Sequence, residues 1–271
     1  MSLAPSRRPP SGEPSFDLDY SIHDVGFDTG LDTRYLTQRV EELLLEEGTR
    51  PGGRTLDVAC GIGKLAAAVS GLGGEGWGID PSEEMLVDLS SFIFAGYGVV
   101  LVRGIAEELP FRDSSFDRVV CQGSLDHFVD PHAFMSEAAR VLRPDGRLVI
   151  ALTNYESLSC RLGRLRQRVS SDLLRRPPPP YRPYCQVPPD HHHKGELAFV
   201  LRLGGSHLRL VRCYGISLLW LAEGWGSWLE RLPRSAAHLM LKALDRIAYP
   251  TPELADMIIS VWQPRKERSR R

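Results

Sequence analysis

Residues 55–66 read TLDVACGIGKLA, and this stretch decides how the rest of the chain is interpreted. The residues before the turn are apolar enough for a buried strand. Gly61 and Gly63 permit a tight turn, because glycine adopts positive φ without steric cost. Residues 64–72 have the apolar spacing of a helix. The first free N–H groups of a helix point at whatever binds in front of them, so the stretch predicts a ligand site.

Two cofactor classes use a turn of this kind. Gly61-x-Gly63-x-x-Ala66 satisfies the dinucleotide pattern, and Asp80 follows at the distance expected for ribose recognition. Asp57 argues against a dinucleotide, because a pyrophosphate binds poorly beside an anion. S-adenosylmethionine carries an ammonium group that a carboxylate attracts. In the alternative interpretation, Asp57 only caps an N–H group of the loop.

Composition sets the outer bounds. The chain has 271 residues, of which 42% are hydrophobic and 25% charged, with a formal net charge of −1. This is ordinary globular composition, and the overall charge does not attract the protein to nucleic acid or membranes. No apolar run follows Arg7 and Arg8, so we expect no signal peptide and no transmembrane segment. The five cysteines form no C-x-x-C pair, which predicts reduced thiols in a cytoplasmic protein.

The chain divides into three parts. Residues 1–14 are rich in proline and predict a disordered arm, 15–263 a single domain, and 264–271 a basic tail. The segment Phe16–Arg34 either folds over the ligand site, where Tyr20 and His23 would contact substrate, or packs as a solvated helix on the sheet edge.

Strand and helix patterns alternate along the domain. Further strands are predicted at 76–80, 99–102, 115–121, 147–152, 207–214 and 255–262, and further helices at 36–48, 133–142, 196–203 and 236–247, with Arg143–Gly146 as a turn. Alternation of this kind is typical of an α/β, doubly wound sheet.

The second strand ends in Asp80, which could accept both hydroxyls of a ribose. Alternatively it begins a helix, since Pro81 suits a first helical position and acidic residues follow. Met85 lies on the inner face of that helix, either against adenine or as plain core.

Residues from about 50 to 153 resemble a class I S-adenosylmethionine-dependent methyltransferase, and most closely the small-molecule group typified by the ubiquinone and menaquinone biosynthesis enzymes. Five motifs carry the resemblance, and their joint order and spacing are far more specific than a lone glycine motif. They are Asp57-Val-Ala-Cys-Gly61-Ile-Gly63, Asp80-Pro-Ser-Glu-Glu-Met85-Leu, Ala106-Glu107-Glu-Leu-Pro110-Phe111, Ser115-Phe-Asp117 and Arg140-Val-Leu-Arg-Pro144-Asp-Gly146.

The resemblance implies a Rossmann-like sheet of seven strands in the order 3-2-1-4-5-7-6, mostly parallel with one antiparallel strand, and a helical cap between strands 5 and 6. It implies that one set of residues holds S-adenosylmethionine: Asp57, Ala59, Gly61, Gly63, Asp80, Pro81, Met85, Ala106, Glu107, Gln122 and Gly123. Many members have an aspartate where this chain has Ile105, so adenine must be held by backbone or by Glu107.

Methyl transfer needs few catalytic groups from the protein, because the sulfonium is already an activated methyl donor. Catalysis is chiefly the positioning of an acceptor in line with the methyl group. A general base helps when the acceptor is a hydroxyl or an acidic C–H group. His127 follows the fourth strand and is our candidate for that base, with hydrogen bonding within the loop as the alternative.

The cap region, about 154–203 and 216–250, is expected to select the acceptor. Its arginines favour either an anionic acceptor or a solvated helix face. Asp190-His191-His192-His193 suggests a metal, but adjacent histidines point in different directions, so we predict no metal and instead a lid in which His192 faces the acceptor. The apolar segment 216–229 is expected to line an acceptor pocket through Trp220, with a homodimer contact, a membrane surface and internal packing as alternatives.

The sequence thus predicts methyl transfer from S-adenosylmethionine to a small-molecule acceptor that is apolar or anionic, with no nucleic-acid partner. A catalytically silent cofactor-binding or scaffold protein of the same fold is the alternative, based on Ile105 and the lack of an assured base. A nicotinamide dehydrogenase is disfavoured by Asp57.

Overall fold

The computed structural model describes residues 30–88, 98–173, 175, 177, 182–205 and 207–265. The predicted N-terminal arm, Tyr20, His23 and residues 266–271 of the predicted tail lie outside these ranges.

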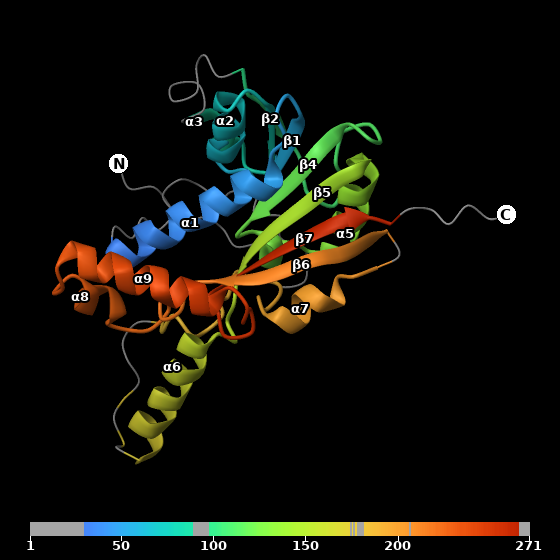
Figure 1. Cartoon of the computed structure of the whole chain (residues 1–271). Coiled ribbons are helices and arrows are strands. Elements are labelled where there is room, and N and C mark those ends of the chain that lie inside the picture. The colour runs from blue at the N-terminus through green and yellow to red at the C-terminus, as the bar shows by residue number, and fades with distance from the viewer. Residues whose placement is uncertain are drawn as a thin grey trace, which may run out of the picture.

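The described residues form a seven-stranded sheet in the order β3-β2-β1-β4-β5-β7-β6 (Figure 1). The strands are β1 (Arg54–Val58), β2 (Glu75–Asp80), β3 (Val100–Arg103), β4 (Phe116–Gln122), β5 (Leu142–Thr153), β6 (Leu208–Ile216) and β7 (Met257–Pro264). β7 runs antiparallel to both β5 and β6, while the other neighbours are parallel. The expected order and the expected antiparallel strand are therefore confirmed.

The helices lie between the strands. They are α1 (Leu31–Gly48), α2 (Lys64–Gly71), α3 (Glu83–Asp88), α5 (Pro131–Val141), α6 (Leu158–Arg168), α7 (Leu197–Arg202), α8 (Trp225–Leu229) and α9 (Arg234–Ala248), with a short 3₁₀ turn, η2 (Leu125–His127), and a π turn, η3 (Val169–Leu173). Among these described helices, none has the length and apolar content needed to cross a membrane.

The sheet is buried on both faces, which its alternating side chains make possible. On β4, Val119 points into a core formed with α5 and α7, whereas Val120 points into a second core formed with α1. The same alternation continues on β5, where Ile150 faces the first core and Val149 the second. The helices thus leave the strand ends as the place for a ligand.

One boundary differs from the sequence expectation. β5 begins at Leu142, directly after α5, rather than after a separate turn. Leu142 of β5 pairs with Phe116 of β4, but the next pair joins Arg147 of β5 to Arg118 of β4. Residues 143–146 therefore bulge out of register inside the strand, and the expected turn is present as this bulge.

Two glycines on β2 allow α2 to lie directly against the sheet. A Cβ atom at Gly76 would be 1.9 Å from the carbonyl oxygen of Ala66 on α2, and one at Gly78 would be 2.7 Å from Sγ of Cys60. Both glycines face the same side because side chains alternate along a strand. This close approach fixes the position of the turn that starts α2.

Candidate cofactor and active site

The glycine turn between β1 and α2 has the conformation that its sequence predicts. Gly61 has φ of 53° and Gly63 has φ of 78°, both in the left-handed region that favours glycine. Ala59 is also left-handed, with φ of 55°, which is uncommon for a residue with a Cβ atom. The N–H of Gly63 donates to the carbonyl of Cys60 at 2.9 Å, which closes the turn.

Asp80 fastens this turn to the end of β2. Its Oδ2 accepts from the backbone N–H of Gly61 at 2.7 Å, and its Oδ1 accepts from that of Ser82 at 2.9 Å. The second contact is the helix-start arrangement that the sequence offered as an alternative, since Ser82 in turn accepts from the N–H of Met85. Asp80 therefore joins the glycine turn to the loop that follows β2.

Asp57 lies in β1 and is only 5% exposed. Burial, and secondly the nearby charge of Asp80, raise the pKa of Asp57 to about 8. The same causes, burial first and then Asp57 and Asp80, hold the pKa of the Cys60 thiol well above its usual value. Two buried acids side by side fit a cationic ligand, because a positive charge would relieve their repulsion.

The predicted adenine side is built from buried apolar residues. Met85 and Ala106 are both buried, and a Cβ atom at Gly61 would lie 3.0 Å from the Met85 methyl group. Glu107, by contrast, turns toward the loop before α5, where its Oε1 accepts from the N–H groups of Val129 and Asp130 at 2.9 and 3.3 Å. These contacts favour a structural role for Glu107.

The other residues predicted to hold the cofactor lie at or just after the ends of β4 and β2. Gln122 is the exposed last residue of β4, and Gly123 follows with φ of 68°. The N–H of Gly123 donates to the carbonyl of Ala151 on β5 at 2.8 Å. Pro81, at the end of β2, is half-buried beside Asp80.

His127 is half-buried at the end of η2 and meets a histidine from a distant segment. Its ring centroid lies 4.2 Å from that of His191. The backbone carbonyl of Asp126 accepts from the N–H groups of His192 and His193, both at 2.9 Å, which docks this loop onto η2. The residue turned toward His127 is therefore His191, whereas the side chain of His192, the one named from the sequence, is exposed.

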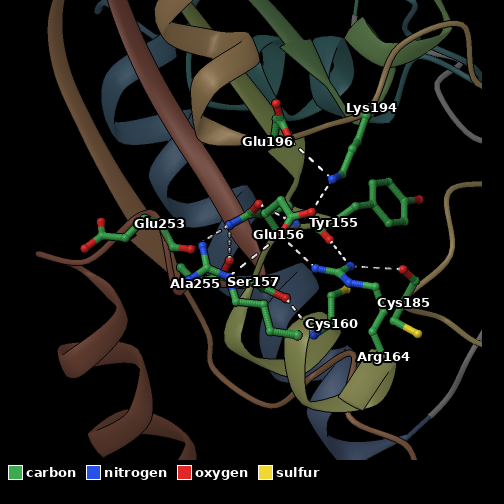
Figure 2. A network of polar contacts seen from close by, with 12 residues as sticks. Tyr155, Glu156, Ser157, Cys160, Arg164, Cys185, Lys194, Glu196, Glu253 and Ala255 are labelled. Carbon is green, nitrogen blue, oxygen red and sulfur yellow. Dashed lines mark hydrogen bonds and ion pairs between the residues drawn. The ribbon is translucent and has the colours of Figure 1, made fainter. Parts of the chain in front are cut away.

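The start of the cap is anchored by a polar network (Figure 2). Arg164 of α6 donates to the carbonyl of Tyr155 at 2.7 Å and to Oε2 of Glu156 at 2.7 Å. Lys194 lies at the end of the histidine loop, residues 190–194. It pairs with the same carboxylate and also with Glu196. The network ties the end of β5 to the histidine loop, while α6 projects away from the sheet (Figure 1).

The contacts of three cap arginines bear on whether these side chains select an anionic acceptor or form a solvated helix face. Arg164 and Arg161 pair with Glu156, and Arg166 pairs with Glu223 at 3.0 Å. These pairs favour the solvated-face interpretation for those three arginines. A cavity of about 500 Å³ lies beside them, and its lining includes Arg166, Arg182, Tyr184, Cys185 and Leu221.

Trp220 is held within the chain. Its indole N–H donates to Oγ1 of Thr33 at 3.1 Å, and its backbone N–H donates to Oδ2 of Asp256 at 2.8 Å. Burial raises the pKa of Asp256 to about 6 against the lowering effect of its hydrogen bonds. These contacts favour internal packing for Trp220, the last of the alternatives that the sequence left open.

Comparison with known proteins agrees with this geometry. Residues 56–150 match the family of the methyltransferase domain. An uncharacterized methyltransferase of Bacillus subtilis, YcgJ, is 42% identical over 100 residues, which are 36% of this chain and 39% of that protein. Demethylmenaquinone methyltransferase of Staphylococcus aureus is 38% identical over 121 residues, 44% of this chain and 50% of that protein.

Among solved structures, the PH0226 protein of Pyrococcus horikoshii superposes with a TM-score of 0.55 at 19% identity, covering 88% of this chain and 93% of that one. This likeness concerns the fold. Together these matches support a methyltransferase domain of the class I, S-adenosylmethionine-dependent type over residues 56–150. The matches span half or less of the curated relatives' length.

Proposed function

We propose that the protein transfers a methyl group from S-adenosylmethionine to a small-molecule acceptor by in-line displacement. The observation that carries the proposal is the buried Asp57, with its pKa raised to about 8, in front of a left-handed glycine turn. A ligand with an ammonium group fits this position, whereas a pyrophosphate would add repulsion. Calorimetric titration with S-adenosylmethionine and with NAD tests it, and binding of NAD alone would refute it.

Different residues around the turn would hold different parts of the cofactor. Asp57, Ala59, Gly61 and Gly63 would hold its amino acid part together with Gln122 and Gly123, Asp80 and Pro81 its ribose, and Met85, Ala106 and Glu107 its adenine side. When bound, S-adenosylmethionine supplies an activated methyl group. The protein then has to exclude water, orient the acceptor and, for an acceptor that loses a proton, accept that proton.

The proposed acceptor is a small molecule with an apolar or anionic part, and no nucleic-acid partner is proposed. The cavity in the cap supports this, since its lining combines Tyr184 and Leu221 with Arg182. Tyr20, His23, His192 and Trp220 stay predicted substrate contacts. A homodimer contact through the tryptophan segment is a further prediction, supported by Trp228, which is 42% exposed.

His127→Ala is expected to lower turnover by roughly 100-fold while the Kd for S-adenosylmethionine stays unchanged, because a general base contributes about two orders of magnitude or more. Turnover is measured as S-adenosylhomocysteine formed with acceptors found in a methyl-transfer screen, and Kd by calorimetry. His132→Ala is the matched control, since His132 is exposed on α5. Near-normal turnover in His127→Ala would remove His127 from the mechanism.

Cofactor binding is expected to release a proton and to tighten as pH rises from 6 to 8. With a pKa of about 8, Asp57 is mostly protonated at pH 7 in the ligand-free protein, and an ammonium group beside it favours the ionised form. Affinity should therefore rise by up to roughly tenfold per pH unit and level off above pH 8.

The released proton is counted by calorimetry at pH 7 in two buffers of different ionisation enthalpy. The same linkage makes the contribution of Asp57 to ligand-free stability fall as pH rises from about 4 to 8, because the folded form holds the extra proton. A pH-independent affinity without proton release would contradict the placement of the ammonium group at Asp57.

A further inference from the structure

Asp126 and His191 form a buried pair that the sequence keeps far apart. Nδ1 of His191 lies 2.8 Å from Oδ2 of Asp126, and the two side chains are 10% and 2% exposed. At this separation an unprotonated Nδ1 would place a lone pair beside a carboxylate oxygen, which is repulsive. The contact therefore requires a proton on Nδ1, and a neutral ring then keeps its lone pair on Nε2.

The pair is held against His127 by the backbone and by ring contacts. The carbonyl of Asp126 accepts from the two N–H groups that follow His191, and Tyr155 packs edge-on against the His191 ring at 5.7 Å. Donor atoms of Asp126, His127 and His191 all lie within 4.8 Å of one another. Ring nitrogens at that distance can exchange a proton through one bridging water.

Three donors so arranged also suggest a metal ion, but the geometry favours a proton relay. A bound transition metal keeps nitrogen and oxygen ligands about 2.0–2.2 Å from itself, which spreads them to roughly 3 Å or more. The separation of 2.8 Å between Nδ1 and Oδ2 is shorter than that spacing and is instead that of a charged pair.

We propose that His191, oriented by Asp126, positions His127 and receives the proton that His127 takes from the methyl acceptor. The inference rests on the proposed methyl transfer and narrows its acceptor to a hydroxyl or acidic C–H group, which must lose a proton. In an oxygen acceptor the O–methyl bond would form as the sulfonium–methyl bond breaks and S-adenosylhomocysteine leaves, and the proton of the O–H group would pass to His127 and then to His191. Asp126 stays ionised throughout and balances the imidazolium charge.

The carboxylate of Asp126 also has an oxygen available to balance the imidazolium charge. Its Oδ1 is buried without a hydrogen-bond partner among the described residues, so the carboxylate is not neutralised by other donors there. Tyr155, which lies against the His191 ring, is acted on by the charges of Asp126, of Arg182 from the cap and of Asp190 from the histidine loop.

The first test is nitrogen NMR of protein labelled with ¹⁵N-histidine, with the resonances of the eight histidines assigned through single variants. Above the titration range, wild-type His191 is expected in the Nδ1–H form. Asp126→Asn should reverse the tautomer, because an amide can donate to Nδ1, and should also shift the His127 resonances. Asp113→Asn, at a side chain that is 76% exposed, should leave both rings unchanged.

A wild-type His191 in the Nε2–H form would overturn the proposal, and this tautomer is read from the spectrum of the wild-type protein itself. An unchanged tautomer in a folded Asp126→Asn protein would also overturn it. So would a stoichiometric divalent metal in the purified protein whose removal by EDTA moves both rings. The NMR result needs no cofactor, so failure of S-adenosylmethionine binding would refute the proposed function separately.

The second test asks whether His191 acts through His127. His191→Phe keeps an aromatic ring beside Tyr155 and should lower turnover by roughly tenfold or more at unchanged cofactor Kd. In the His127→Ala background the same change should have no further effect, because the proton no longer enters the relay. Equal losses in both backgrounds, or no loss in the single variant, would overturn the relay. His132→Phe is the control.

Discussion

Asp57→Asn is expected to weaken S-adenosylmethionine binding by on the order of 100-fold while leaving the ligand-free protein equally or more stable. The side chain is buried in β1, so an amide of the same size fits without repacking. It cannot balance an ammonium group, and losing one partner of a buried ion pair costs about 3 kcal/mol. In the absence of ligand, the change also removes a buried ionisable group whose pKa is raised by burial and secondly by the charge of Asp80.

Calorimetry gives the affinity and thermal unfolding gives the stability of the same preparations. Asp113→Asn is the matched control, because it makes the same chemical change at an exposed side chain. Affinity is expected to fall while stability is kept or rises, whereas a general loss of structure would lower both affinity and stability. Affinity within threefold of wild type would place the cofactor's ammonium group elsewhere.

Gly76→Ala is expected to be the most destabilising of the single-methyl changes considered, by about 3 kcal/mol or more. The added Cβ would lie 1.9 Å from the carbonyl oxygen of Ala66 and 2.9 Å from Oγ of Ser70. The carbonyl belongs to the backbone of α2, so the whole helix must move away from β2. That movement would also displace the glycine turn at the start of α2.

Denaturant unfolding at equilibrium measures the loss. Gly205→Ala is the control, since its nearest atom would be the carbonyl oxygen of Leu203 at 4.0 Å, and it is expected to change stability by less than about 0.5 kcal/mol. Stability close to wild type in Gly76→Ala would mean that α2 does not lie against β2 as described. Reduced cofactor affinity in any folded Gly76→Ala protein is expected as well.

Sequence reasoning succeeded where the signal is local. The turn at Gly61 and Gly63, the acid that ends β2 and the strand order follow from apolar periodicity, glycine positions and family motifs within short windows. The close packing at Gly76 also had a readable signal, because glycines two apart in a strand indicate a close approach on one face.

Long-range contacts lay beyond sequence reasoning. His191 meets Asp126 across the fold, and three adjacent histidines give no local reason to prefer the first over His192. Glu107 could bind adenine or backbone, and only the folded chain shows its contact with Val129. Trp220 could equally line a pocket or pack on α1, until its bond to Thr33 is known.

The position of β7 has a consequence for the order in which the chain folds. β7 lies between β5 and β6, although it is synthesised after both. Until the residues of β7 emerge from the ribosome, one edge of β5 is unpaired and β6 has no neighbour in the sheet. The cap then connects two strands that are not yet joined. Such late, non-local pairing slows folding and exposes strand edges to other chains. Nascent chains that stall before Met257 should therefore depend on chaperones and aggregate readily.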